Sequence, residues 1–154
     1  MSALLEVSNL SVAYGGIKAV RGLSLEVGQG EMVCLIGANG AGKTTTLKAI
    51  SGLIAPHAGG VHFDGQSLTR LPAHEVARRG LALVPEGRGV FSRMSVAENL
   101  MMGAYTRRDR AAIARDLEQV YALLPRLTER QAQLAGLLSG GEQQRTAICR
   151  ALAN

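Results

Sequence analysis

Short apolar stretches separated by glycine and polar residues fill the first third of the chain. Leu4–Val7 and Leu10–Tyr14 are rich in apolar residues, and Lys18–Val27 alternates loosely between apolar and polar positions. Residues of a strand that face a core recur at every second position, so these three segments predict strands. The positions expected to face the core in the third segment are Ala19, Leu23, Leu25 and Val27.

Two further apolar runs are uninterrupted. Met32–Ile36 and Leu81–Val84 contain no polar position, which is the pattern of a strand buried on both faces of a sheet. Between them, Gly59–Leu68 is expected to form a hairpin around Asp64 and Gly65, a pair that is typical of a two-residue turn.

Helical spacing appears after the sequence GANGAGKTT, where Leu47, Ile50 and Leu53 recur on one helix face. Ser95 and Glu98 form an S-x-x-E capping box that predicts the start of another helix. A stripe at positions i, i+4, i+7, i+8 and i+11 indicates a further helix: Ile113, Leu117, Val120, Tyr121 and Leu124. Mixed charges on its other face favour packing against a neighbouring element over lying on a membrane.

Composition limits the class of protein. The 154 residues fit a single domain, and 47% of them are hydrophobic, which is ordinary for a globular core. No apolar run approaches the roughly 18–20 residues that span a bilayer, and the start MSALLEVSNL lacks the basic residues of a signal peptide. Cys34 and Cys149 do not have a metal-binding or redox spacing. We therefore expect a cytosolic protein.

Net charge adds little to this picture. The formal charge of +5 could serve nucleic acid, anionic lipid or phosphate ligands. The arginines are spread and alternate with Asp and Glu, which is the pattern of a solvated helix face. Only 3% of the residues are aromatic, so few side chains could stack on bases and nucleic-acid binding is not expected.

The eight residues from Gly37 to Thr44 fit the phosphate-binding pattern G-x-x-x-x-G-K-[ST] in full. Glycines let successive backbone N–H groups converge on phosphate oxygens, and the following helix turns its positive end to the same anion. Lys43 is expected to reach the β- and γ-phosphates, and Thr44 to supply a hydroxyl to Mg²⁺. The residues expected to bind a nucleoside triphosphate are Gly37, Ala38, Asn39, Gly40, Ala41, Gly42, Lys43, Thr44 and Thr45.

This loop does not name a reaction, because kinases, GTPases and motor ATPases share it. A GTPase would be expected to carry an N-K-x-D element, which the sequence lacks, and a kinase would not need the motif Ser139-Gly140-Gly141-Glu142. That motif is a second capping box, but a plain helix start would not place two glycines where each costs up to roughly 1 kcal/mol relative to alanine. Bare N–H groups there suit close approach of an anion.

Together the two motifs resemble those of the ATP-binding subunits of ABC transporters. Leu138 to Glu142 is similar to the family signature L-S-G-G-Q, with Glu142 in the fifth position. The resemblance covers essentially the whole chain. It implies an α/β fold: a P-loop NTPase core with an N-terminal antiparallel β part over 1–85, and an α-helical subdomain over 86–154. Tyr14 falls where family members carry an aromatic residue that stacks on adenine; an ordinary aromatic at a strand end is the alternative.

The resemblance also implies a mechanism. Two ATPase subunits, identical or different, would pair head to tail, with ATP and Mg²⁺ between the loop of one subunit and Ser139, Gly140, Gly141 and Glu142 of the other. ATP would close the pair and hydrolysis would reopen it, which would move membrane permease subunits. The chain would then lie on the cytoplasmic face of the cell membrane and contact the membrane only through the permease.

The segment VPEGRGVFSRMSVAENLMMGAY is similar to the ATPases of branched-chain amino acid importers and close to those of urea importers. Glu86 stands where most members carry Gln; an ionised carboxylate can approach Mg²⁺ but cannot donate a hydrogen bond. By the resemblance, Lys43 and Glu86 would be catalytic, Thr44 and Glu86 would bind the metal, and Arg88–Met94 would face the permease. A solvent loop with a chance glutamate is the alternative. A non-transport ABC protein is a weaker match, since those usually carry paired cassettes or inserted domains.

In the family, an apolar strand ending in Asp-Glu and a switch histidine follow the signature helix, and neither appears here. The nearest pattern, Val61–Asp64, lacks the glutamate, and His57, His62 and His74 lie outside the motifs. The resemblance therefore implies a subunit truncated after the signature helix, with the C-terminal part of the core missing. Such a chain would bind ATP weakly and hydrolyse it inefficiently. A regulatory or residual fragment without catalysis is the alternative.

Overall fold

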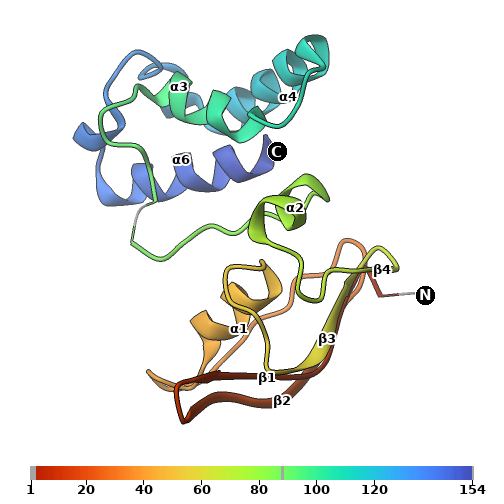
Figure 1. Cartoon of the computed structure of the whole chain (residues 1–154). Helices are drawn as coiled ribbons and strands as arrows, with labels where there is room; N and C mark the ends of the chain where they lie inside the picture. Colours follow the sequence, from red (N-terminus) through yellow and green to blue (C-terminus); the bar gives the residue numbers. More distant parts are fainter. Residues whose placement is uncertain (1–2, 88, 154) are drawn as a thin grey trace. The chain divides into compact units, whose positions relative to one another are not determined.

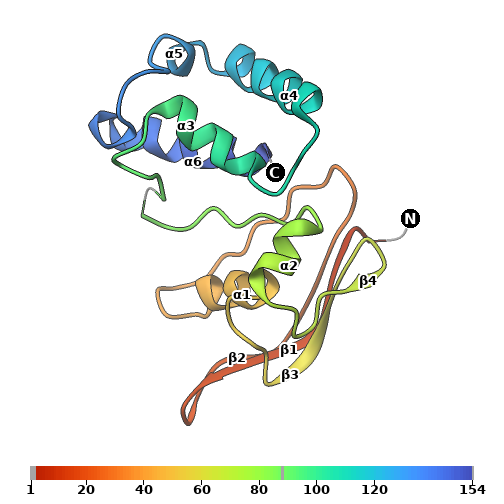
Figure 2. The same cartoon turned by 45° about the horizontal axis from the view of Figure 1, so that its top comes forward.

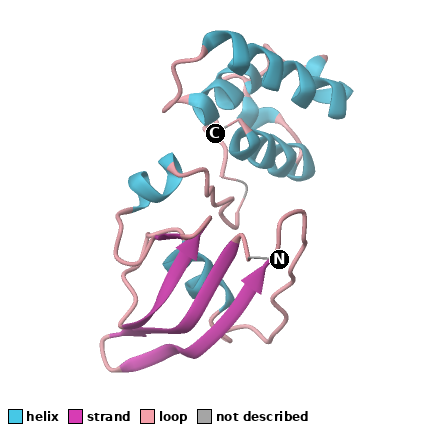
Figure 3. Ribbon diagram, turned by 90° about the vertical axis from the view of Figure 1, so that its right-hand side faces the viewer, coloured by secondary structure: helices cyan, strands magenta, loops and turns pink. Residues whose placement is uncertain are grey.

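The computed structural model describes residues 3–87 and 89–153, and it divides the chain into two compact units, Met1–Leu81 and Ala82–Asn154. The first unit contains an antiparallel sheet with the strand order β2-β1-β3-β4. Its strands are β1 (Leu5–Tyr14), β2 (Ile17–Val27), β3 (Ala58–Phe63) and β4 (Gln66–Ser67), and its helices are α1 (Lys43–Ile50) and α2 (Ala73–Arg78). Figures 1 and 3 show α1 lying against one face of this sheet. The antiparallel β part expected from the sequence is confirmed.

The core of the first unit forms between the sheet and α1. Its largest fully buried side chains are Leu10, Val7, Val12, Val61 and Val76, and Ala49 and Ile50 of α1 pack into the same cluster. Aliphatic side chains fill this cluster, so most of the driving force is burial of branched apolar surface.

Irregularities in the pairing set which residues of β1 and β2 face the core. The pairing register shifts between Val7 and Leu10, between Leu10 and Val12, and between Val12 and Ala13. Asn9 and Gly22, near the first two shifts, adopt left-handed φ values of 50° and 64°. An extra residue in a strand reverses the alternation beyond it. The two short strands predicted before Tyr14 are therefore one bulged strand. Val20, which the alternation did not select, is buried at 6% exposure.

The predicted hairpin is confirmed. β3 and β4 pair His62 with Ser67 and Phe63 with Gln66, and Asp64 and Gly65 form the turn with φ of 47° and 71°. Positive φ at both turn positions matches the right-handed twist of the flanking strands.

The strands predicted at Met32–Ile36 and Leu81–Val84 were wrong. Both segments are irregular, and Met32 and Ile36 are 94% and 92% exposed. No backbone hydrogen bond joins either segment to another among the residues that the structure describes. A strand buried on both faces depends on hydrogen-bonded neighbours and on layers above and below it, and the described part of the chain supplies no such neighbours to these two runs.

The second unit is helical. It comprises α3 (Val96–Met101), η1 (Met102–Ala104), α4 (Arg110–Leu123), α5 (Pro125–Thr128), η2 (Ala135–Leu137) and α6 (Gly140–Leu152). α3 and α6 lie side by side, as Figures 1 and 2 both show. None of the helices in the described residues combines the length and the apolar character needed to span a bilayer.

The capping box at Ser95 and the apolar stripe from Ile113 to Leu124 predicted two of these helices correctly. α3 begins after Ser95, whose hydroxyl accepts a hydrogen bond from Glu98 N at 3.2 Å while the Glu98 carboxylate accepts one from Ser95 N at 2.7 Å. The stripe predicted on α4 is confirmed, because Ile113 and Val120 are buried and Leu117, Tyr121 and Leu124 pack against the core of this unit.

Candidate functional site

The phosphate loop, Gly37–Thr44, runs into the N-terminus of α1. Gly42 is the residue before the helix and has a φ of 90°, and a Cβ atom there would lie 2.5 Å from the carbonyl oxygen of Ala19 in β2. Gly40 also has a positive φ, of 84°. The close approach of the loop to β2 therefore depends on glycine at position 42.

Backbone N–H groups at the turn into α1 are free to bind a ligand. Thr46 N donates to Gly42 O at 2.8 Å, so the intrahelical bonds begin only there. No backbone acceptor within the described residues is bonded to the N–H groups of Gly42, Lys43, Thr44 or Thr45. Converging N–H groups with the positive end of a helix behind them form a binding site for phosphate.

Lys43 folds back over this loop. Its ammonium group donates hydrogen bonds to the carbonyl oxygens of Gly37 at 2.7 Å and Ala38 at 2.8 Å. The Thr44 side chain is exposed, and its hydroxyl makes no hydrogen bond in the part of the chain that the structure describes. The loop thus combines a positive charge and a free hydroxyl, which are the groups that phosphate oxygens and a magnesium ion require.

Thr46 supports the loop and was missed by the sequence analysis. It is buried, and its hydroxyl donates to Gly42 O at 2.9 Å. A hollow of about 500 Å³ lies beside it, lined by Ala19–Ser24, Gly40, Ala41 and Thr46. Threonine at this position has no motif of its own, since it only extends the run of threonines after Lys43.

Tyr14 lies at the end of β1, where it pairs with Ile17 across the turn to β2. Its side chain is 49% exposed and does not line the hollow beside the phosphate loop. An aromatic ring exposed at a strand end can stack on a flat ligand, so its predicted role remains a proposal.

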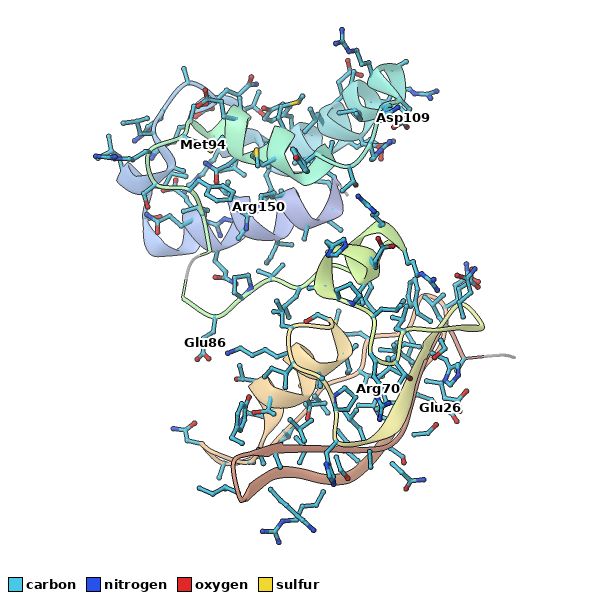
Figure 4. All side chains as sticks on the ribbon, viewed as in Figure 1. Glu26, Arg70, Glu86, Met94, Asp109 and Arg150 are labelled. Atoms are coloured by element: carbon cyan, nitrogen blue, oxygen red, sulfur yellow. The ribbon has the colours of Figure 1, made fainter. Side chains whose placement is uncertain are left out.

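Glu86 belongs to the second unit, on the segment that precedes α3, where Figure 4 labels it. It is exposed and has no ion pair or hydrogen bond among the described residues. Of the predicted permease-facing segment Arg88–Met94, Arg88 lies outside the residues that the structure describes. No three His, Cys, Asp or Glu side chains in the described part of the chain converge in a way that could hold a metal ion. Of the two predicted metal ligands, Thr44 belongs to the first unit and Glu86 to the second.

The signature segment begins α6. Ser139 precedes the helix, its N–H donates to the Glu142 carboxylate at 2.9 Å, and its hydroxyl donates to the same carboxylate at 2.7 Å. These hydrogen bonds from Ser139, first from the hydroxyl and then from the backbone, hold the pKa of Glu142 below its usual range, and Arg130 at 3.4 Å adds to the effect. The predicted capping box is therefore present.

The two glycines of the signature are exposed, and their N–H groups make no hydrogen bond within the described residues. A Cβ atom at Gly141 would meet only the far end of the Arg145 side chain, at 3.8 Å. Packing inside the chain therefore does not require glycine at position 141. This geometry is consistent with a ligand or partner outside the chain that approaches the backbone closely at this position.

Comparison with known proteins tests the resemblance suggested by the two motifs. The profile of the ABC transporter family matches residues 20–154, which include both the phosphate loop and the signature.

The chain belongs to the ABC transporter family.

Similar proteins and structures agree with this assignment. The chain is 47% identical over 150 residues to the high-affinity branched-chain amino acid transport ATP-binding protein BraG of Pseudomonas aeruginosa, covering 97% of this chain and 64% of BraG. It is 39% identical over 153 residues to the lipopolysaccharide export system ATP-binding protein LptB of Escherichia coli K12, covering 98% of this chain and 63% of LptB. It thus spans less than two thirds of either relative.

A solved ATP-binding subunit of an ABC transporter matches the structure with a TM-score of 0.84 at 33% identity, over 97% of this chain and 62% of that one. The predicted α/β fold of an ABC ATPase is therefore confirmed for the part of the family fold that the chain contains.

Proposed function

We propose that this ABC transporter chain binds ATP and Mg²⁺ and forms part of an ATPase that energises import of branched-chain amino acids. The observation that carries the proposal is the phosphate loop, in which free N–H groups, the Lys43 ammonium and the helix N-terminus converge. Phosphate would draw the ammonium away from the carbonyl oxygens of Gly37 and Ala38, because a charge-assisted bond to phosphate is stronger than one to a neutral carbonyl. Tyr14 would stack on the base, and Thr44 and Glu86 would bind the metal.

A second ATPase subunit, identical or different, would complete the site. The exposed N–H groups of Gly140 and Gly141 support this step, because nothing in the described part of the chain occupies them. Ser139, Gly140 and Gly141 of one copy would meet the γ-phosphate held by the other copy. ATP would then close the pair. Size measurement by light scattering tests this idea: Mg²⁺-ATP is expected to shift the wild-type chain toward a dimer, and a chain that stays monomeric at saturating ATP contradicts it.

Hydrolysis by the chain itself is expected to be slow. Phosphoryl transfer to water needs a group that orients the attacking water, in addition to binding and charge stabilisation. Lys43 and Thr44 provide binding and charge, and neither side chain is a carboxylate that could orient the attacking water. Steady-state phosphate release from the purified chain tests this. Robust Mg²⁺-dependent turnover that Lys43→Ala abolishes would contradict the proposal of slow hydrolysis.

The transported solute is proposed from similarity to BraG, whose name specifies branched-chain amino acids. A related urea or amide importer is the second candidate, and the export function in the name of LptB is a third. The membrane contact would run through permease subunits that bind the region Arg88–Met94, with the chain on the cytoplasmic face. Copurification of permease subunits from membranes separates a transporter role from a non-transport one. Uptake of labelled leucine, compared with labelled urea, then identifies the solute class.

A further inference from the structure

One loop of the second unit is held far more firmly than its exposure suggests. The loop Gly89–Ser95 leads into α3, and the Asn99 side chain beneath it is fully buried, at 0% exposure. The Asn99 amide oxygen accepts from Phe91 N at 2.8 Å, and the amide nitrogen donates to Phe91 O at 3.0 Å and to Ser95 O at 2.9 Å, with Met94 O at 3.3 Å. One side chain therefore bonds backbone groups of three loop residues, Phe91, Met94 and Ser95.

Arg150 of α6 holds the loop from a second side. Its Nη2 atom donates to the carbonyl oxygen of Gly89 at 2.6 Å, and its guanidinium carbon lies 5.1 Å from the centroid of the Phe91 ring. Figure 4 labels Arg150 on α6, the helix that begins with the signature. A guanidinium over an aromatic face is attracted by the negative face of the ring. The same side chain therefore contacts both the backbone and the aromatic residue of the loop.

Backbone bonds hold the loop from a third side. Gly136 N donates to Ser92 O at 3.1 Å, and Ala135 N donates to Met94 O at 2.9 Å. A Cβ atom at Gly136 would lie 2.9 Å from Ser92 O, so glycine permits this close approach. Three separate elements, α3, α6 and η2, thus fix the path of the loop.

The fixed loop presents side chains outward. Phe91 is 48% exposed, and Ser92 and Arg93 are exposed. Neither of the Ser92 and Arg93 side chains makes a hydrogen bond or an ion pair within the described residues. Side chains held in place before contact reduce the entropy lost on binding. A rigid loop that exposes an aromatic ring and a cation is suited to recognise a partner protein.

We propose that Asn99 and Arg150 are positioning residues that hold Gly89–Ser95 in one conformation for docking of the permease. The assignment of the permease as partner rests on the function proposed above, whereas the rigidity of the loop does not. Neither residue lies in the phosphate loop or the signature. Neither residue belongs to a sequence motif, because their partners are mostly backbone carbonyl groups.

The chain has no tryptophan, so Phe91→Trp introduces a single tryptophan reporter beneath Arg150, which can be excited apart from the three tyrosines. In this background, Arg150→Gln is expected to raise the acrylamide quenching constant at least about twofold. Arg150→Lys keeps the charge but loses the planar group, so its quenching constant should lie between those of the Phe91→Trp protein and the Arg150→Gln variant. Arg126→Gln, an exposed change on α5, is the matched control and should leave quenching unchanged. Quenching that is equal in all four proteins overturns the proposal.

Asn99→Asp separates positioning from folding, because the new side chain keeps the acceptor for Phe91 N and loses the donors to the carbonyl oxygens. Hydrogen exchange of the Met94 amide, which is bonded to Phe91 O, is expected to accelerate at least about tenfold. Amides in the middle of α4 report global stability and should change far less. Equal acceleration at both places, or none at Met94, overturns the proposal.

The docking role has its own readout in the assembled transporter. Arg150→Gln is expected to reduce permease copurification at least about fivefold while ATP binding stays within about twofold of the wild type. Undiminished copurification overturns the docking role. A wild-type chain that does not bind ATP would instead contradict the proposed function, while the quenching and exchange results on the loop would still stand. Failure of the proposed function and failure of the positioning role are therefore distinguishable.

Discussion

Gly42 and Gly141 are glycine for different structural reasons. At position 42 the fold of the chain requires glycine, because the backbone has a φ of 90° and a Cβ atom would lie 2.5 Å from Ala19 O. At position 141 the fold does not require glycine, since a Cβ atom would meet only the end of the Arg145 side chain. The first glycine shapes the phosphate loop, and the second is explained by a ligand or partner that approaches α6.

Gly141→Ala is therefore expected to stabilise the isolated chain by about 0.5–1 kcal/mol, because alanine has the higher helix propensity. The same change should weaken ATP-induced dimer formation at least about tenfold, since the methyl group would stand where a phosphate approaches. Urea unfolding and light scattering measure the two effects. Gly103→Ala serves as the control, because a Cβ atom there would clash with Arg150 O and should destabilise the fold. Unchanged dimerisation in Gly141→Ala would rule out the signature role.

The Glu142 carboxylate makes part of the stability dependent on pH. Hydrogen bonds from Ser139 lower its pKa in the folded state from the ordinary value near 4.5. Its stabilising contribution is therefore complete above about pH 4.5 and is lost as the pH falls through the lower folded value. Glu142→Gln should flatten the stability profile of the chain in this acid window while retaining the capping box. Urea unfolding at several pH values measures this pH dependence of stability, with Glu118→Gln on α4 as the control. Identical stability profiles for Glu142→Gln and the wild type would contradict the proposed contribution of Glu142.

At the scale of elements, the sequence predicted what local interactions decide. The capping boxes at Ser95 and Ser139 need only four consecutive residues, and both helices begin there. Strand positions depend on distant partners. The bulges near Asn9 and Gly22 reversed the alternation of core-facing and outward-facing positions, so the sequence pattern did not select Val20 as a core residue. The residues with proposed roles divide in the same way: the phosphate loop has a fixed spacing, whereas Thr46 at the loop, and Asn99 and Arg150 away from it, are defined only by their contacts.

The apolar run Met32–Ile36 has an energetic consequence. Because Ile36 is 92% exposed, replacing it removes little buried surface. Ile36→Ser is expected to change the free energy of unfolding by less than about 0.5 kcal/mol and to reduce aggregation, since an exposed apolar segment with unpaired backbone promotes association. Val61→Ser, at a position 1% exposed, is the control and should cost several kcal/mol. Thermal unfolding and light scattering check both; a large loss of stability in Ile36→Ser would contradict the exposed conformation.

Across the whole molecule, the two units have separate cores, and each unit carries one of the two motifs. The phosphate loop lies in Met1–Leu81, with a core of sheet and α1 residues, and the signature lies in Ala82–Asn154, with a core of helical residues. The resemblance to the family came from the pairing of the two motifs, which composition and charge could not have supplied, and the match over residues 20–154 confirmed it. The solute could not be derived from these residues, because none of the proposed roles includes contact with it.

Calorimetric titration of the purified chain with Mg²⁺-ATP examines the proposed ATP site itself, with Lys43→Ala and Lys48→Ala as a matched pair. Both lysines lie on α1, but only Lys43 is at the phosphate loop. We predict saturable binding by the wild type, at least about tenfold weaker binding by Lys43→Ala, which corresponds to about 1.4 kcal/mol or more, and little change in Lys48→Ala. A folded wild-type chain that does not bind ATP, or equal loss in the two variants, would contradict the central claim.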